Sequence, residues 1–302
     1  MKESFGKSPL AIALIGVGRI GSTFAYQLAA AGHEVTLIAR PGSARLGQLQ
    51  RDHGIVLETG ARVQTLVTDR LDEQKVYDLV IVTLLAEHVD AILPALTRSK
   101  AKCIHFMFVS FEPELLLNAI GKTRCSFGMP FITATLDGDG KLRPAIGSRN
   151  TIHSEQRWVD LFNLAGVPSA LETRMTLWLR CHTPIAIMLE NIAFAGQRHN
   201  GGATWAEAKI VSLGLKGCYA IIKGLGYDIY PSSKGFFNSL PLFILTLILW
   251  LGSRVKPFRE LLSQGIGEAR ALTDIVLAAA AKAELQTPEA IKAVSNTKEI
   301  QY

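Results

Sequence analysis

A glycine triad near the start of the chain constrains the fold more than any other feature. The motif consists of Gly16, Val17, Gly18, Arg19, Ile20 and Gly21. The apolar run 10–17 that leads into it is short and bounded by polar residues, as expected of a buried parallel strand. After the motif, apolar residues recur at helical spacing up to Gly32, and a second apolar run, 35–39, follows. This order of strand, glycine turn, helix and strand predicts a dinucleotide-binding unit.

Each glycine has its own role in such a unit. Gly16 makes the tight turn, Gly18 lets the backbone approach a pyrophosphate, and Gly21 lets the helix pack on the strand. The N-terminus of the helix then receives the negative charge of the phosphates. The alternative is a tight strand–helix turn that binds nothing, and the motif alone leaves it open.

The end of the second strand indicates the type of dinucleotide. Sites for NAD place an acidic residue there, about 20 residues on, to hold the ribose 2′-hydroxyl. Here Arg40 stands nineteen residues after Gly21, and Arg45 follows closely. A guanidinium binds a 2′-phosphate, whereas a carboxylate would repel it. The sequence therefore favours NADP(H), with a merely solvated arginine at the strand end as the alternative.

Length and composition narrow the class of protein. A chain of 302 residues is long enough for two domains, and a hydrophobic content of 48% excludes a disordered chain. The net charge of +6 is dispersed without a basic run, so we expect no nucleic-acid partner; a phosphorylated cofactor or an anionic substrate accounts for it. The four cysteines lie far apart without a CxxC pair, which favours free thiols in a reducing compartment and a cytoplasmic protein.

Two apolar stretches resemble targeting or membrane segments. The N-terminal run continues into the glycine motif without a cleavage site, so it is interpreted as a strand and not as a signal peptide. Residues 240–251 form the second stretch, but a bilayer core of ~30 Å needs about 20 helical residues. We therefore expect no membrane anchor. The stretch predicts a helix buried between domains or between subunits; in the second case a homodimer would form through it.

The first half of the chain alternates between predicted strands and helices. Strands are expected over 77–83, 102–109, from 123 and over 169–173, and helices through 89–96 and over 114–120 and 155–165. The turn Asp137-Gly138-Asp139-Gly140 between two apolar runs predicts a hairpin. The pattern predicts an α/β fold over residues 1–173, a doubly wound parallel sheet with an antiparallel addition.

Strand signals stop after residue 173. Thr204 and Glu207 form a capping box that opens a helix. Further signals are a helix over 259–285, broken near Gly265 and Gly267, and a last helix that starts at Thr287-Pro288. Residues 174–302 are therefore expected to form an all-helical domain, with a small-molecule substrate held in the cleft between the two domains.

Several stretches resemble the ketopantoate reductase (2-dehydropantoate 2-reductase) family. They are IALIGVGRIGSTFAYQLAAAGHEVTLIAR at the start, DLVIVTLLAEHV at residues 78–89, and Gly128-Met129-Pro130 before the hairpin. The family also carries a helix-borne glutamate about twenty residues before the proline of the last helix, and Glu268 stands twenty residues before Pro288. The resemblance covers nearly the whole chain. It implies a Rossmann-like N-terminal domain, a helical C-terminal domain and NADPH-dependent reduction of a small molecule.

The chain departs from the family at the catalytic positions. Where the family has VTLKA, with a lysine that binds cofactor and substrate carboxylate, this chain has Leu85. The Asn-Gly pair of the next strand is replaced by the sequence IHFMF over 104–108. The lysine expected in the first helix of the second domain is absent from 175–182, which reads MTLWLRCH. The chain thus resembles a divergent member that lacks the family's catalytic lysines.

Three residues are candidates for the catalytic role. His182 is a candidate general acid because imidazole titrates near pH ~6.5. Arg180 could anchor an anion but is a poor proton donor, and Glu268 could hold the hydroxyl or amine of the substrate. The alternatives are a histidine that satisfies a local backbone group and a solvated helix glutamate. No metal site is expected, because His105, His153 and His199 lack metal-ligand spacing.

Two functions follow from these observations. The first is NADPH-dependent reduction of a C=O or C=N group in a small molecule that is not ketopantoate. The second is a non-catalytic NADP(H)-binding sensor or partner protein, which would need neither His182 nor Glu268.

Overall fold

A computed structural model of the chain describes residues 8–262 and 266–301. Its contacts divide the chain into two compact units. The sheet unit comprises the chain up to Phe108 together with Glu114–Met175, and the helical unit comprises Val109–Pro113 and the chain from Thr176 onward. Gly265, one of the two glycines near the predicted helix break, lies outside the described residues.

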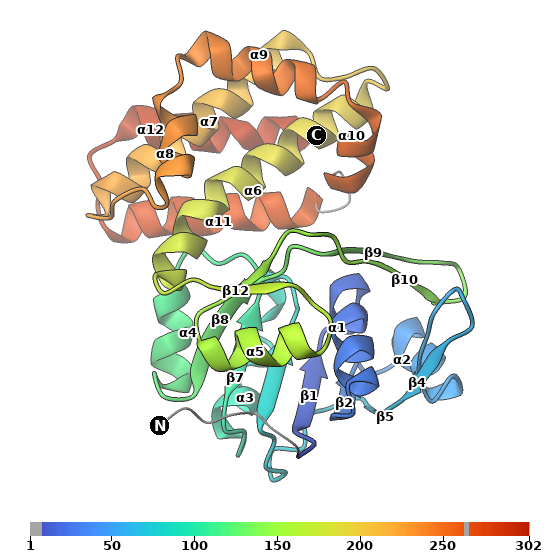
Figure 1. Ribbon diagram of the computed structural model, residues 1–302. Coiled ribbons are helices and arrows are strands. Elements are labelled where there is room, and N and C mark those ends of the chain that lie inside the picture. The colour runs from blue at the N-terminus through green and yellow to red at the C-terminus, as the bar shows by residue number, and fades with distance from the viewer. Residues whose placement is uncertain (1–7, 263–265, 302) are drawn as a thin grey trace. The chain divides into compact units, whose positions relative to one another are not determined.

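The sheet unit is built on one eight-stranded sheet with the order β12-β11-β8-β7-β6-β1-β2-β5 (Figure 1). Its strands are β1 Ala11–Ile15, β2 Glu34–Ile38, β5 Leu66–Thr68, β6 Leu79–Val82, β7 Ile104–Met107, β8 Cys125–Met129, β11 Thr151–His153 and β12 Ser169–Leu171. All neighbours are parallel except β11 and β8. The chain runs from β1 outward to β2 and β5 and then returns to β6 on the other side of β1. The strand order therefore reverses at β1, where such sheets bind their ligands.

The helices and short strands of the sheet unit complete the predicted α/β pattern. The helices are α1 Arg19–Ala30, α2 Ala44–Arg51, the 3₁₀ turn η1 Ala86–His88, α3 Leu93–Arg98, α4 Pro113–Ile120 and α5 Gln156–Leu164. Two antiparallel ribbons pair β3 Gly54–Val56 with β4 Arg62–Gln64, and β9 Thr133–Leu136 with β10 Leu142–Ala145. The second ribbon is the predicted hairpin, closed by the amide of Asp137 donating to the Lys141 carbonyl.

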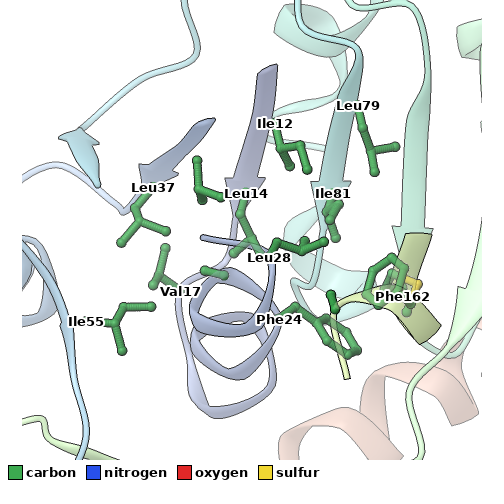
Figure 2. Packing of buried hydrophobic residues seen from close by; sticks show 14 of the residues in the cluster. Ile12, Leu14, Val17, Phe24, Leu28, Leu37, Ile55, Leu79, Ile81 and Phe162 are labelled. Atoms are coloured by element: carbon green, nitrogen blue, oxygen red, sulfur yellow. The ribbon is translucent and has the colours of Figure 1, made fainter. Parts of the chain in front are cut away.

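The core of the sheet unit lies between β1, its neighbours and α1. Figure 2 shows Leu28 of α1 beside Leu14 of β1, and Phe24 of α1 on the side of Phe162. Phe24 also meets Phe162 of α5 edge-on, with ring centres 5.0 Å apart. Phe24, Leu28 and Leu14 are fully buried, and each such side chain contributes about 1.5–3 kcal/mol. This packing fixes the glycine turn between β1 and α1.

The predicted helix through 89–96 differs in the structure. Residues 89–92 form a bend and a turn between η1 and α3, and only 93–96 are helical, with Pro94 in the first turn of α3. Proline has no amide hydrogen and clashes with the preceding turn, so a helix cannot continue through it from residue 86 but can begin at it. The apolar periodicity of 89–96 indicates a helix, but the position of Pro94 determines where the helix begins.

The described part of the helical unit contains helices and no strand. They are α6 Met175–Arg198, which begins in the last residue of the sheet unit, α7 Trp205–Gly224, α8 Ser232–Ser239, α9 Leu242–Gly252, α10 Lys256–Leu262, α11 Ile266–Lys282, α12 Pro288–Asn296 and the 3₁₀ turn η3 Thr297–Gln301. The capping box of Thr204 and Glu207 is confirmed, with both reciprocal hydrogen bonds present. Thr287 precedes α12 as predicted, but its side chain makes no capping hydrogen bond.

Helix α9 corresponds to the apolar stretch 240–251. One face, with Leu245 and Leu249, is buried, whereas Phe243 is 65% exposed and Leu251 is 51% exposed. The chain by itself therefore does not bury this helix on all sides. In the described residues no single helix is long and apolar enough to cross a membrane; α8 and α9 reach the required length and hydropathy only as a pair, bent by 105°.

Candidate functional site

The glycine turn between β1 and α1 admits no side chain at two of its three glycines. Gly16 has a φ of +95°, and a Cβ there would lie 2.9 Å from the carbonyl carbon of Thr83. A Cβ on Gly21 would lie 2.2 Å from the Gly16 carbonyl oxygen and 2.5 Å from Thr83 Oγ1. The Thr83 hydroxyl donates to that carbonyl oxygen at 2.7 Å, so the end of β6 closes the turn. These contacts hold the start of α1 tightly against the sheet.

The third glycine opens the turn. A Cβ on Gly18 would meet no atom within 4 Å, so the space above its backbone is free. Gly18 is the N-cap of α1 without a side-chain capping bond, and the first turn holds no acidic residue. The positive end of the helix is thus available to an anion. Between the glycines, Val17 is buried in the core, Arg19 is exposed and Ile20 is half-buried, so Val17 can reach a ligand only with its backbone.

Arg45 fixes this turn from α2. Its Nε donates to the Val17 carbonyl at 2.9 Å, its Nη2 to Ser22 Oγ at 2.6 Å and its Nη1 to the Gly140 carbonyl at 2.8 Å. Burial lowers the pKa of its guanidinium from the ordinary value. Arg45 therefore positions the glycine turn, and the sequence, which showed only its closeness to Arg40, gave no sign of these contacts.

Arg40 lies at the same edge of the sheet as the glycine turn. It follows β2, the parallel neighbour of β1, and the amide of Gly16 donates to the Ile38 carbonyl at 3.4 Å. The Arg40 side chain is exposed, and its carbonyl accepts from Ser43, which caps α2. A guanidinium in this loop can turn toward a charged group beside the turn. Leu85, at the position of the family's first lysine, is 38% exposed just after β6.

The structure separates Arg180 from His182, although both lie on α6. Residues two apart on a helix point to different faces. The Arg180 side chain is 4% exposed, and its guanidinium carbon lies 3.8 Å from the centre of the Tyr227 ring. His182 is half-buried and stacks on the Trp178 indole, with ring centres 4.6 Å apart.

A lysine that the sequence did not reveal lies beside the same indole. Lys234 is the buried residue of α8, 5% exposed, and its Nζ donates to the Trp178 carbonyl at 2.7 Å. The ammonium also lies 3.4 Å from the centre of the Trp178 ring. Lys234 and Trp178 are 56 residues apart in the sequence, so no local motif indicates their contact.

The loop before α8 is fastened to the same part of α6. The amide of Tyr230 donates to Cys181 Sγ at 3.4 Å, and the thiol contacts the Asp228 carbonyl at 3.5 Å. The hydroxyl of Tyr219 in α7 donates to the Cys181 carbonyl at 3.3 Å. The half-buried imidazole of His182 on α6 and the buried ammonium of Lys234 on α8 thus meet at one indole, that of Trp178.

Glu268 lies in the first turn of α11, near a second carboxyl group on α6. Burial, together with the charge of Glu268, raises the pKa of Glu190 to about 9, and a hydrogen bond from the Ala269 amide opposes this shift only in part. Glu190 Oε2 is buried without a hydrogen-bond partner. Glu190 is therefore protonated at neutral pH. No local motif indicates this pair, because its members are 78 residues apart.

His105 and His153 form a buried chain of hydrogen bonds in the sheet unit. His105 Nε2 lies 2.9 Å from His153 Nδ1, and their other ring nitrogens bond to Ser126 and Ser169. Burial lowers the pKa of both rings, that of His153 to about 3. In the described residues no group of three His, Cys, Asp or Glu side chains is arranged to hold a metal ion.

A mainly parallel sheet with a glycine turn at its switch point, followed by helices, defines the class of Rossmann-like α/β folds. Within that class, residues 12–154 match the family model of ketopantoate reductase PanE/ApbA. The resemblance inferred from the sequence is thereby confirmed, and the chain has a ketopantoate reductase-like fold.

Solved structures extend the likeness over the whole chain. A PanE/ApbA family ketopantoate reductase from Ralstonia eutropha JMP134 is 18% identical with a TM-score of 0.72, over 96% of this chain and 98% of the other. D-mandelate dehydrogenase, solved with NADH and anilino(oxo)acetate, is 15% identical with a TM-score of 0.72, over 96% and 98%. The dimeric ketopantoate reductase of Staphylococcus aureus is 15% identical with a TM-score of 0.63, over 97% and 99%. No curated protein sequence matches the chain.

Proposed function

We propose that this chain is an NADPH-dependent reductase of a small molecule. The observation that supports it best is the glycine turn, in which side chains are excluded at Gly16 and Gly21 while Gly18 faces open space at an uncapped helix N-terminus. A pyrophosphate fits such a place because backbone amides and the helix dipole favour negative charge. Arg40 would hold the 2′-phosphate. D-mandelate dehydrogenase, one of the similar structures, was solved with NADH.

The proposed reaction reduces a C=O or C=N group, for which NADPH supplies the hydride when bound. Residues 1–173 would hold the cofactor and residues 174–302 the substrate. Ketopantoate is expected to be a poor substrate, because Leu85 replaces the lysine that would pair with its carboxylate and an unpaired buried carboxylate is strongly disfavoured. Turnover of ketopantoate in the ordinary enzyme range, about 1–1,000 per second, would contradict this expectation.

His182 is the proposed proton donor to the product oxygen or nitrogen. Its imidazole is half-buried and stacked on Trp178, beside the Lys234 ammonium. Arg180 would anchor a negative group of the substrate, and Glu268 would orient its reacting end. His182→Ala should lower turnover by about 10²–10⁴-fold while NADPH binding stays within twofold or so, since general acid catalysis is worth about that much.

The test follows the loss of NADPH absorbance with a panel of 2-oxo acids, ketones and cyclic imines. Oxidation of NADPH by any of them supports the reductase. The competing function, an NADP(H) sensor or partner protein, predicts tight cofactor binding and no turnover with the panel. It also predicts that His182→Ala leaves cofactor binding unchanged. A His182→Ala variant with most of the wild-type rate on a validated substrate would show that the proton comes from elsewhere.

We also propose a cytoplasmic homodimer formed through α9. Ile244 and Ile248, 42% and 45% exposed, continue the apolar face begun by Phe243 and Leu251. A contiguous apolar patch of this kind marks an interaction surface. Ile248→Glu would place a charge in that interface, and light scattering should then show a dimer converted to a monomer. A wild-type chain that is monomeric at micromolar concentration would exclude this interface.

A further inference from the structure

Arg45 joins parts of the sheet unit that lie far apart in the sequence. Its side chain extends from α2 and donates to the Val17 carbonyl of the glycine turn at 2.9 Å and to Ser22 Oγ of α1 at 2.6 Å. It also donates to the Gly140 carbonyl, at the tip of the β9–β10 hairpin, at 2.8 Å. Gly140 and Arg45 are 95 residues apart in the chain. One guanidinium thus holds α2, the glycine turn and the hairpin tip together.

The donors of Arg45 are nearly all used within the protein. A fourth bond joins its Nη1 to Gln48 Oε1 at 2.5 Å, so four of the five N–H groups of the guanidinium are engaged. All four acceptors are neutral, and the carboxylate of Asp52 is joined to Arg45 only through the Gln48 side chain. Arg45 therefore leaves a positive charge beside the turn, but it has no free pair of donors for a 2′-phosphate. Arg40, in contrast, is exposed.

The bond from Arg45 to Val17 fixes the orientation of one peptide group in the glycine turn. The carbonyl of this group, that of Val17, accepts from Arg45 and also from Ser22 Oγ at 3.4 Å. Its amide, that of Gly18, donates to the Gly16 carbonyl at 2.8 Å. Because a peptide group is planar, holding both of its ends holds its plane. Arg45 therefore fixes the backbone at Gly18, which the pyrophosphate of the proposed cofactor would approach.

The hairpin tip leaves no room beside Arg45 for a larger residue. Gly140 has a φ of +81°, in the left-handed region that favours glycine. A Cβ there would lie 2.8 Å from Gln48 Oε1 and 3.0 Å from Arg45 Nη1. A methyl group on Gly140 must therefore displace the ends of both side chains. Since Arg45 also holds the Val17 carbonyl, a change at the hairpin tip is expected to reach the glycine turn.

We propose that Arg45 is a positioning residue for the cofactor and couples the tip of the β9–β10 hairpin to cofactor binding. This inference rests on the proposed function, because the ligand concerned is the dinucleotide at the glycine turn. Arg45 acts on the binding of the pyrophosphate, which NADPH and NADH share, whereas Arg40 reads the 2′-phosphate, which only NADPH carries. The hairpin acts on the cofactor through Arg45.

Fluorescence titration of the full chain with NADPH and with NADH tests the role of Arg45. Arg45→Met keeps much of the aliphatic chain and removes the donors and the charge. It should weaken the binding of both cofactors by the same factor, about tenfold or more, because charge-assisted hydrogen bonds that hold the turn are lost. The ratio of the two dissociation constants should therefore stay at its wild-type value. Arg40→Ala should instead change this ratio and leave NADH affinity unaltered.

Gly140→Ala tests the coupling to the hairpin. It should weaken the binding of both cofactors by about three- to tenfold, because the added methyl group displaces Arg45 from its place behind the turn. Gly60→Ala is the matched control. Gly60 also has a positive φ, +88°, in the turn of the β3–β4 ribbon, and a Cβ there would meet no atom within 4 Å. The backbone strain is therefore similar, but Arg45 is not displaced, and both affinities should stay at the wild-type values.

The outcomes separate this inference from the proposed function. A wild-type chain that binds neither dinucleotide overturns the proposed function and the inference with it. Wild-type binding that Arg45→Met leaves unchanged, in protein that circular dichroism shows to be folded, overturns the inference alone. A loss of affinity confined to NADPH in Arg45→Met also overturns it, because Arg45 would then read the 2′-phosphate. If Arg45→Met does not fold, Gly140→Ala decides: affinities equal to those of Gly60→Ala overturn the coupling.

Discussion

Single residues of the glycine turn separate what the fold needs from what the cofactor needs. Gly21 is enclosed by Gly16 and Thr83, so its lack of a side chain is a packing requirement. Gly18 faces open space with a φ of −80°, which any residue can adopt, so the fold itself does not require glycine there. The sequence predicted both roles, because they follow from the spacing of the motif. The contacts of Arg45 and Lys234 could not be predicted from the sequence, because their partners come from distant segments.

The two glycines therefore give opposite expectations. Gly21→Ala should lower the free energy of unfolding by about 2–4 kcal/mol, because backbone must shift to admit the methyl group. Gly18→Ala should lower it by about 1 kcal/mol or less, because alanine is a poorer N-cap than glycine, but should weaken NADPH binding, because in the proposed site the methyl group would stand where the pyrophosphate approaches the backbone. Urea denaturation and fluorescence titration measure the two effects. A Gly21→Ala protein as stable as the wild type would show that the turn is looser than its contacts indicate.

Glu190 makes stability depend on pH in an unusual direction. Its carboxyl has a pKa of about 9 in the folded chain, raised by burial and by Glu268, against an ordinary value of 4.5. A raised carboxyl pKa contributes stability that is complete below pH 4.5 and is lost as the pH rises toward 9, because the unfolded chain releases the proton first. Glu190→Gln keeps the neutral shape and removes this titration.

We expect the stability of Glu190→Gln, relative to wild type, to increase by about 2–4 kcal/mol between pH ~5 and pH ~8. Urea denaturation of both proteins at the two pH values measures the difference, and titrations shared by both cancel. A constant difference between the proteins would mean that Glu190 is ionised in the folded state.

Among the helices and strands, those with a clear apolar period in the sequence were predicted correctly. β1, α1 and β2 follow directly from apolar runs and glycines, and the hairpin from its turn. Helix α2 and strands β3–β5 were not predicted, because they are short and without a clear period, and tertiary contacts decide them. Helix α9 was predicted as a helix, but the exposure of one of its faces depends on neighbours that the sequence does not place.

Strands β7 and β11 are joined by the His105–His153 contact, although β8 lies between them in the sheet. Burial lowers the pKa of His105, as do the neighbouring His153 and Arg157 charges, and burial alone lowers that of His153 to about 3. Both rings are neutral in the folded chain, whereas the unfolded chain protonates them below pH 6.5. Their contribution is therefore complete above pH 6.5 and is lost as the pH falls below it, for His153 down to its pKa of about 3.

Acidification from pH ~6 to pH ~5 should then lower stability through this pair by up to about 2–3 kcal/mol, since each added proton is worth about 1.4 kcal/mol per pH unit. His153→Gln should remove about half of that slope, because one titrating ring remains. His88→Gln, at an exposed position, should leave the slope unchanged. Identical slopes in all three proteins would show that the buried rings accept protons without unfolding.

For the whole molecule, the alternation of strands and helices and its end near residue 173 were enough to predict the fold class. Which charged side chains lie close together could not be predicted in the same way. The cation beside His182 comes from α8 and the carboxyl beside Glu268 from α6, and each depends on how helices pack within the helical unit. A sequence pattern reports which face of a helix is apolar, but not which distant helix covers it.

Binding of the proposed cofactor would couple the site to the stability of the whole chain. A ligand that binds only the folded state adds RT ln(1 + [L]/Kd), about 2.7 kcal/mol at a hundredfold excess over Kd. NADPH should therefore raise the melting temperature more than NADH at equal concentration, because losing the charge-assisted contacts of Arg40 with the 2′-phosphate weakens binding about tenfold or more.

Arg40→Ala should abolish the difference between the two cofactors without changing the melting temperature of the free protein, since Arg40 is exposed. Arg51→Ala, an exposed arginine at the end of α2, is the matched control and should retain the preference. Equal shifts by NADH and NADPH in the wild type, unaltered in Arg40→Ala, would show that this arginine does not read the phosphate.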